Sequence, residues 1–272
     1  MINAAMVNGI FLKTLRDMRT ALLWSALGLF LMSLYLVTFF PSIEENYATL
    51  TEIFERMGPT ITALTGGEMD ISTVEGFLAT KVFSLTYPVI LIAFGIAFGA
   101  GLVGGEEESG TLDVLLATPV ARWRVVLAKF AALVAFVAVV LAATFLGFVA
   151  GAKLVDLETM RTGRILAGVI NLGPLTLFFA ALALALSCWR NARGPALGVP
   201  VAVAAGSWLI HALASVSDIP AWLHKLTPWY YYDGQRALLH GPRLGGMLLL
   251  LVLAVALVAV AAWSLEHRDV GV

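Results

Sequence analysis

Six long stretches without a charged side chain constrain the fold more than any other feature of this sequence. Each stretch holds 20 to 25 residues, and none contains Asp, Glu, Lys or Arg. About 20 apolar residues, rising roughly 1.5 Å each in a helix, cross a hydrocarbon core about 30 Å thick. The sequence therefore predicts an all-α membrane protein with six transmembrane helices, at residues 20–43, 82–105, 130–152, 165–189, 194–217 and 244–263.

The composition indicates a single membrane domain over residues 1–272. Of the residues, 60% are hydrophobic and 13% are charged, whereas soluble proteins carry about 25% charged residues. No hydrophilic stretch is long enough for a separate nucleotide-binding or catalytic domain. The net charge of −1 gives no reason to expect a nucleic-acid partner, and the single Cys188 excludes an internal disulfide and a Cys-rich metal site.

An even number of spans puts both chain termini on the same side of the membrane. Lys13, Arg16 and Arg19 flank the first span, where an excess of basic residues usually marks the cytoplasmic side. We therefore expect cytoplasmic termini in the plasma (inner) membrane. The acidic segment 41–80 then forms an external, partly helical loop, in which Ser72-Thr-Val-Glu75 matches a capping box. This loop either covers a pore mouth, binds a partner, or simply connects two spans.

Residues 7–22 form an amphipathic pattern ahead of the first span. Apolar residues recur at helical spacing, and the basic residues Lys13, Arg16 and Arg19 accompany them. This pattern favours an interfacial elbow helix, the alternative being a first span with a basic flank. In span two, Gly95-x-x-x-Gly99 allows another helix to approach closely. These glycines indicate either ordinary packing or a bend in a transport pathway.

The segment between spans two and three contains Gly105-x-x-x-x-Gly110-Thr111, which superficially matches a phosphate loop. It lacks the lysine and carries three carboxylates where phosphates would sit, so we expect no nucleotide to bind this chain. Residues 106–118 instead predict a short cytoplasmic helix with acidic residues at its start. Its leucines at 112, 115 and 116 share one face. That face either docks into a groove on another protein or lies against the spans of this chain.

This segment resembles the signature of the type-2 permeases of ATP-binding-cassette transporters. That signature has acidic residues, Gly-Thr, Leu-x-x-Leu-Leu, Pro, a basic residue and Lys. The matching residues are Glu106, Glu108, Gly110, Thr111, Leu112, Leu115, Leu116, Pro119, Arg122 and Lys129. Glu107 stands where the family often has a basic residue. The order of elbow helix, six spans and an aromatic segment before the last span is also similar to this family.

The resemblance implies the membrane-spanning half of an ATP-driven exporter. Two separate cytoplasmic ATPase subunits would bind ATP and Mg, and the coupling helix at residues 106–118 would dock into them. This chain itself would be neither an enzyme nor a cofactor-binding protein. A second permease chain, identical or related, would complete the path within the lipid bilayer. In similar transporters spans two and five face that partner and the substrate.

The aromatic and histidine residues near the external side are further candidates. His211 is the one potentially charged group inside a span, and with Trp208 it marks a possible gate or simply reaches interfacial water. Trp222 and the aromatic run Trp229–Tyr232 suit a headgroup belt. By resemblance, external helices around residues 219–240 would close an outer gate.

Three other functions can be weighed from the same residues. An ion-coupled carrier usually needs membrane-embedded acids, which the six spans lack. An intramembrane enzyme would need a motif such as H-E-x-x-H or a base beside Cys188, and neither is present. An ATPase-coupled membrane anchor or sensor stays open. A path without charge favours lipids, amphiphilic drugs or peptides over small ions.

Overall fold

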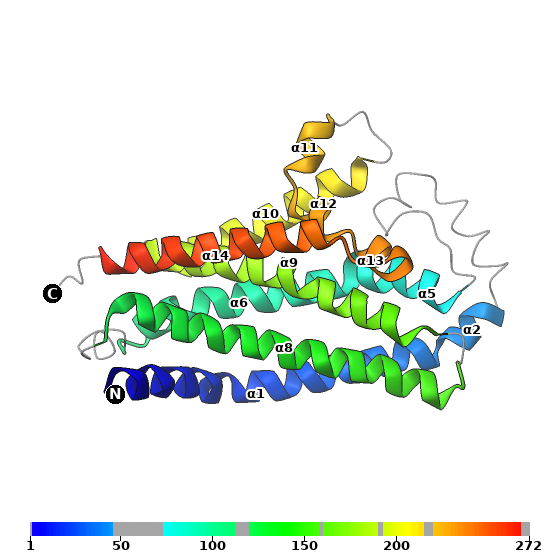
Figure 1. The fold of residues 1–272 in the computed structure, drawn as a ribbon, viewed down its shortest axis with the longest axis horizontal. Helices are drawn as coiled ribbons and strands as arrows, with labels where there is room; N and C mark the ends of the chain where they lie inside the picture. The colour runs from blue at the N-terminus through cyan, green and yellow to red at the C-terminus, as the bar shows by residue number, and fades with distance from the viewer. Residues whose placement is uncertain are drawn as a thin grey trace.

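The computed structural model describes residues 2–45, 73–111, 120–157, 160–189, 193–214 and 220–267. Over these residues the chain is helical with no strand, and six helices are long and apolar enough to cross a membrane, as the sequence predicts. They lie side by side, and α1 begins and α14 ends at the same end of the bundle (Figure 1). The long elements are α1 (Ile2–Thr38), α6 (Tyr87–Glu108), α8 (Arg122–Leu154), α9 (Thr162–Trp189), α10 (Arg193–Leu213) and α14 (Leu244–Glu266).

The centre of the bundle is α9, which packs against α6, α8, α10 and α14. Its sequence is rich in alanine and its side chains are mostly buried. Small side chains let neighbouring helices approach closely, which is how helices associate where lipid offers no hydrophobic driving force. By contrast, α1 lies at the edge of the bundle and packs mainly along α8.

Glycines mark the closest helix contacts. A Cβ added at Gly99 of α6 would lie 2.3 Å from the carbonyl oxygen of Ala180 in α9, and one at Gly95 would lie 2.8 Å from that of Thr176. A Cβ at Gly147 of α8 would similarly meet Phe30 of α1 at 2.3 Å. The Gly95-x-x-x-Gly99 motif is therefore a packing surface between the second and fourth spans of the same chain.

The first element differs from the predicted one, because α1 is one continuous helix of 37 residues instead of an elbow followed by a span. Between Lys13 and Leu22 the sequence contains good helix formers and no Gly or Pro, so nothing ends the helix there. The apolar stripe packs inside the protein: Ile10, with Val7 and Phe11, contacts the start of α8 at Val125 and Ala128. Lys13, Arg16 and Arg19 lie on the exposed side.

The second span begins earlier than predicted and is not uniformly α-helical. It starts with α5 (Val74–Phe77), where the Thr73 hydroxyl accepts a hydrogen bond from Gly76 N at 3.1 Å. A π-helix, η1 (Leu78–Thr86), follows and leads into α6. The predicted capping box started one residue earlier, at Ser72, which lies outside the described residues. Of the predicted external loop 41–80, the structure describes only α2 (Phe40–Glu45), Pro41 among its residues, and the part from Thr73 on.

Three short helices lie at the end of the bundle remote from the termini. They are α11 (Ala221–Lys225), α12 (Pro228–Tyr232) and α13 (Gly234–His240). In Figure 1, α11 projects beyond the bundle above α12, whereas α13 lies over the ends of the long helices. The aromatic run Trp229–Tyr232 thus belongs to a helix that packs on the bundle, against α9, α10 and α14.

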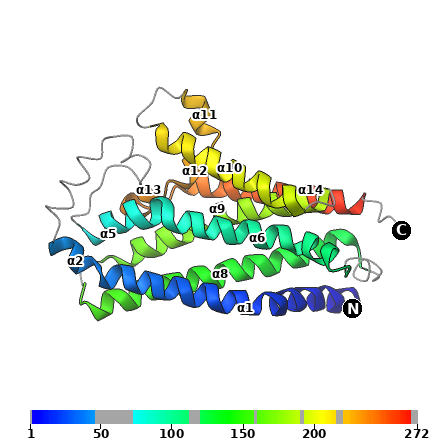
Figure 2. The same ribbon diagram turned by 180° about the vertical axis from the view of Figure 1, so that it is seen from behind.

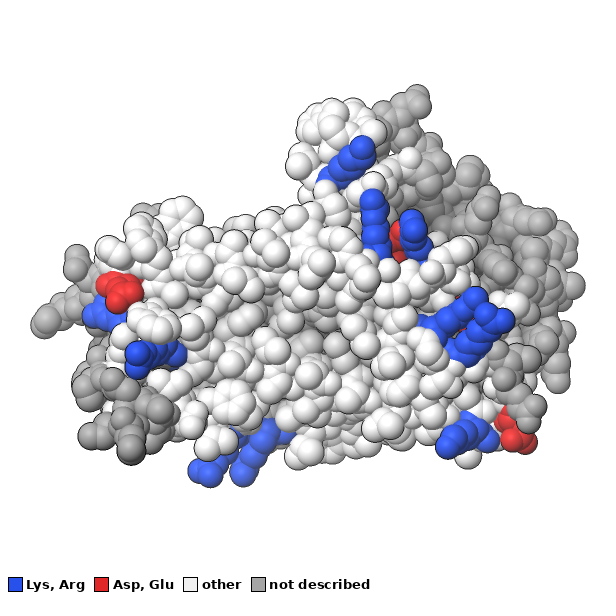
Figure 3. All heavy atoms as spheres, in the orientation of Figure 1, with Lys and Arg blue, Asp and Glu red and all other residues white. Residues whose placement is uncertain are grey.

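Charged side chains gather toward the two ends of the molecule. Figure 3 shows an uncharged band over the middle of α8, α9 and α14, with Lys and Arg toward each end. Such a band is what a hydrocarbon core requires, because an exposed charge there would lose its hydration. With its six apolar helices, the chain is a multi-pass membrane protein.

Candidate functional site

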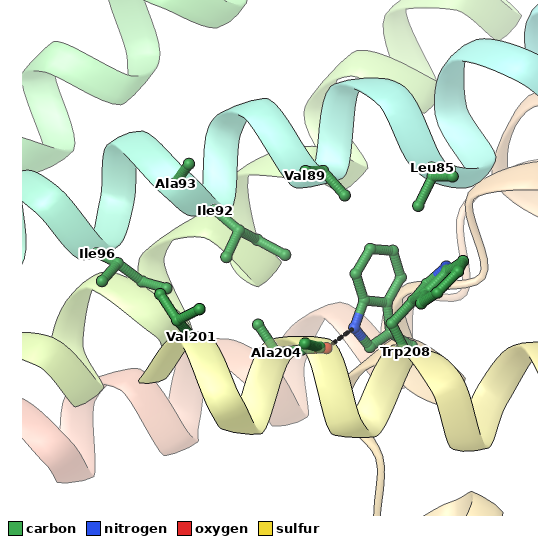
Figure 4. Close-up of a pocket in the computed structure, with 10 residues that line it drawn as sticks. Leu85, Val89, Ile92, Ala93, Ile96, Val201, Ala204 and Trp208 are labelled. Atoms are coloured by element: carbon green, nitrogen blue, oxygen red, sulfur yellow. Dashed lines mark hydrogen bonds between the residues drawn. The ribbon is translucent and has the colours of Figure 1, made fainter. Parts of the chain in front are cut away.

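A pocket of about 280 Å³ lies between α6 and α10. These two helices run next to each other on one side of the bundle (Figure 2). Residues at helical spacing on each helix point into the pocket (Figure 4), because positions three and four apart share a face. Its lining is Leu85, Val89, Ile92, Ala93, Ile96, Val201, Ala204, Ala205, Trp208 and Trp229.

Two tryptophans from different helices form one end of this pocket. Trp208 comes from α10, and Trp229 comes from α12 and is almost fully buried. The indole Nε1 of Trp229 donates a hydrogen bond to the carbonyl oxygen of Ala204 at 3.2 Å, drawn as the dashed line in Figure 4. The only polar atom of that ring is therefore satisfied by backbone, and the ring offers the pocket apolar surface. Trp208 was predicted as a gate residue, whereas the role of Trp229 was not.

His211 lies one helical turn beyond Trp208 and pairs with a second histidine. Its Nδ1 is 2.9 Å from Nε2 of His224 on α11. The ring of His224 in turn packs edge-on against Tyr230, with centroids 4.9 Å apart. Burial lowers the pKa of His224 below its usual range, since the charged imidazolium loses water. Among the described residues no group of three His, Cys, Asp or Glu could hold a metal ion.

Tyr232 fixes the short helices α12 and α13 to the second span. Its hydroxyl donates to the carbonyl oxygen of Phe83 at 2.7 Å. In the π-helix that carbonyl would pair with residue 88, which is proline and has no N–H, while Tyr87 N bonds to Val82 O. The hydroxyl thus satisfies a backbone acceptor that the helix cannot. Burial raises the pKa of Tyr232 well above its usual value, so the donor proton is retained.

Asn171 of α9 provides a second attachment, because its Nδ2 donates to the carbonyl oxygen of Tyr232. The chain then turns sharply at Asp233, whose φ of 38° is left-handed, and the Asp233 carboxylate caps α13 through Arg236 N. Gly234 follows, and a Cβ there would lie 2.2 Å from Phe83 O. Only glycine allows this approach, so α12 and α13 are seated tightly on η1.

At the opposite end, a cluster of charges joins three helices. The carboxylate oxygen Oε1 of Glu106, in the last turn of α6, lies 2.8 Å from Lys129 Nζ of α8 and 3.3 Å from Lys13 Nζ of α1. Lys129 is buried and also donates to the carbonyl oxygen of Leu102. Among the residues that the structure describes, none forms a hydrogen bond with the second, buried carboxylate oxygen of Glu106. Glu106 therefore holds the end of the second span against α1 and α8.

The predicted coupling helix is altered at its start. Glu106, Glu107 and Glu108 continue α6 instead of leading a new helix, because glutamate sustains helix and nothing interrupts it before Gly110. Gly110, with φ of 67°, ends α6 in a Schellman motif: Thr111 N bonds to Glu106 O at 2.9 Å and Gly110 N to Glu107 O at 3.0 Å. Leu112, Leu115 and Leu116, with Pro119, lie outside the described residues.

The candidate residues thus separate into two distant groups. Trp208 and His211 come together with Trp229 and His224 near the pocket, whereas Lys13, Glu106 and Lys129 meet at the end that carries the termini. Gly95 and Gly99 face α9 and not the pocket. Sequence reasoning gave His224 no role, and it assigned Trp229 and Tyr232 only to an aromatic headgroup belt. Spacing along the chain gave no signal for them, since each acts through a partner on a distant element.

A comparison with family models matches residues 13–265 to the C-terminal domain of the multidrug efflux system permease Rv1217c. A search of curated proteins found no match. The matched range includes all of α6, α8, α9 and α10 and most of α1 and α14, and with them the pocket between α6 and α10 and the charge cluster around Glu106. The chain belongs to this family of multidrug efflux permease domains, and it is a membrane permease of the efflux type.

Proposed function

We propose that this chain is the membrane-spanning subunit of an ATP-driven exporter for hydrophobic organic molecules. Two permease chains form the path, separate cytoplasmic ATPase subunits bind ATP and Mg, and the termini lie in the cytoplasm. The observation that carries this proposal is the wholly apolar pocket between α6 and α10, in a chain of a multidrug efflux permease family.

The chemistry of the pocket favours uncharged or amphiphilic substrates. Transfer of apolar surface from water gives about 25 cal/mol per Å², and the ten lining residues bring no charge that would stabilise an ion. A volume of about 280 Å³ is near the lower limit of pockets for drug-sized ligands, about 300 to 1,000 Å³. A second permease chain facing α6 and α10 would enlarge the site, as the resemblance to type-2 permeases implies.

The same helix connects this pocket to the proposed coupling end. Ile96 lines the pocket, and Glu106 lies ten residues further along α6, a distance of roughly 15 Å at the rise of an α-helix. Residues 112–119 follow directly. A push by an ATPase on that segment would act on α6 itself and, through the Glu106–Lys129 contact, on α8.

Filling the pocket tests the substrate site. Ala93 lines it, whereas Ala97 lies one turn further along α6, is also exposed and is not among the lining residues. In cells that produce this chain together with a candidate partner ATPase, Ala93→Trp should lower efflux of a lipophilic dye at least several-fold. Ala97→Trp should leave efflux close to wild type. Equal efflux by both variants, at equal amounts in the membrane, would argue against the pocket.

Co-purification tests the ATPase coupling. We expect an ATPase subunit to co-purify with the wild-type chain in mild detergent and to be lost from Leu115→Asp with Leu116→Asp. If the wild-type chain binds no ATPase, the proposal of ATP-driven export is wrong. Two other results together would favour an ATPase-coupled anchor or sensor. An ATPase would bind without a change in its rate of ATP hydrolysis when hydrophobic compounds are added, and Ala93→Trp and Ala97→Trp would give the same dye efflux.

A further inference from the structure

The contact between His211 and His224 joins two helices at the end of the molecule remote from the termini. Their nitrogens Nδ1 and Nε2 are 2.9 Å apart, and the ring centroids are 5.0 Å apart. In such a bond one nitrogen must accept, and only an unprotonated nitrogen can do so. The two rings can therefore share this bond while they carry one extra proton between them, but not two.

This pair connects the segments that carry both tryptophans of the pocket. Trp208 precedes His211 by one turn of α10. His224 leads into α12 through Thr227, whose hydroxyl donates to the His224 carbonyl oxygen at 2.7 Å and accepts from Tyr230 N at 3.3 Å. Trp229 lies in the first turn of α12. A movement of α11 away from α10 would thus pull on the start of α12, where Trp229 is held to α10 by its bond to the Ala204 carbonyl oxygen.

The charged groups around the pair offer little compensation for two added protons. Tyr230 of α12 packs against His224, and the guanidinium of Arg243 lies 5.0 Å from the centroid of that same Tyr230 ring. Lys225 follows His224 on α11. The carboxylate of Asp233, at the end of α12, is the acidic group that interacts electrostatically with His211. Its single negative charge also interacts with Arg243 before either imidazole is protonated.

Within the described part of the chain, few contacts other than this pair hold α11 in place. None of its five residues is buried, and Trp222 is 65% exposed. Because burial lowers the pKa of His224 from 6.5 in the folded state, the unfolded chain binds the proton more tightly. The stabilisation from the neutral ring is therefore complete above about pH 6.5 and is lost as the pH falls through the folded-state value.

We propose that His211 and His224 form a proton-sensitive latch that holds α11 against α10 and releases it when both rings are protonated. In the orientation proposed above, the latch senses the pH outside the cell and regulates the tryptophan end of the pocket. This consequence for transport rests on the proposed function, whereas the release of α11 does not.

A distance measurement on the full-length chain tests the latch. Nitroxide labels at Trp222→Cys on α11 and Leu248→Cys on α14, both at exposed positions, would be introduced with Cys188→Ser and measured by pulsed electron paramagnetic resonance in lipid nanodiscs. We expect one narrow distance distribution at pH 8 and a broader or shifted distribution at pH 3.5, where both rings are protonated, and the change should reverse on return to pH 8. An unchanged distribution at pH 3.5 would overturn the latch.

Histidine variants show which side chains cause the pH-dependent change in the distance distribution. His211→Gln and His224→Gln remove the protonation and should each give a distribution that is the same at both pH values. His240→Gln on α13, an exposed histidine at the same end, should respond as the labelled parent does. A full response in both His211→Gln and His224→Gln would also refute the latch. The outcome is independent of the dye-efflux test, so either proposal can fail alone.

Discussion

Lys129 is a buried cation at the end of the bundle that carries the chain termini. Its side chain is 4% exposed and rests on the carboxylate of Glu106, which Lys13 contacts from a side chain that is 53% exposed. A buried charge without its partner is costly, whereas an exposed ion pair contributes about 0–1 kcal/mol. Both lysines therefore contact the same carboxylate, but the contact of Lys129 should contribute much more to the folding free energy than that of Lys13.

We predict that Lys129→Met destabilises the folded chain by about 3 kcal/mol or more, because Glu106 then keeps only an exposed partner. Lys13→Met should cost less than about 1 kcal/mol. Thermal unfolding of the purified chain in detergent measures both changes. Adding Glu106→Gln to Lys129→Met should recover part of the loss, and equal effects of the two lysine variants would contradict this account.

The histidines show the limit of sequence reasoning at this scale. His211 could be selected from the sequence because it interrupts an otherwise unionisable span. His224 could not, because its importance comes from a ring nitrogen 2.9 Å from His211, and that distance depends on how the chain returns between α10 and α11. Lys129 was named only as part of a motif, and its contact with Glu106 was not foreseen.

At the scale of elements, the contact between α6 and α9 depends on the absence of a side chain at one position. We predict that Gly99→Ala destabilises the bundle by about 1–3 kcal/mol, since its Cβ would lie 2.3 Å from Ala180 O and the helices must separate. Gly101→Ala, on the same helix with no atom within 4 Å of its Cβ, should be neutral or stabilise by up to about 1 kcal/mol. Thermal unfolding again separates the two, and similar losses would disprove the close approach.

The attachment of α12 and α13 to η1 gives a second element-scale prediction. Tyr232→Phe removes the one hydroxyl that satisfies Phe83 O, at an expected cost of about 1–3 kcal/mol for an unpaired buried carbonyl. Hydrogen exchange in peptides covering residues 228–240 should then become faster. Tyr231→Phe, in the same aromatic run but partly exposed, should leave exchange unchanged. Faster exchange in both variants would mean that the hydroxyl of Tyr232 is not what attaches α12 and α13 to η1.

At the scale of the whole molecule, the proposed orientation puts both chain ends, which lie at the same end of the bundle, in the cytoplasm. We expect Trp222→Cys on α11 to react with a membrane-impermeant maleimide in intact cells. Glu266→Cys, at the end of α14 and at the same end of the bundle as the start of α1, should react only after permeabilisation. Cys188 is fully buried and adds little background. The reverse pattern would place the termini outside and would overturn the proposed side of the ATPase.

The sequence by itself determined the six spans, their order and the membrane setting, because hydrophobicity and length are properties of each segment alone. It also identified Trp208 and His211 as worth attention, and its coupling helix over Leu112, Leu115 and Leu116 stays a prediction. Only the tertiary structure decided that α1 is continuous, that Gly95 and Gly99 serve packing, and that Tyr232, His224 and Lys129 meet their partners. Such pairings depend on the register between helices, which the packing of many side chains sets together and no local pattern records.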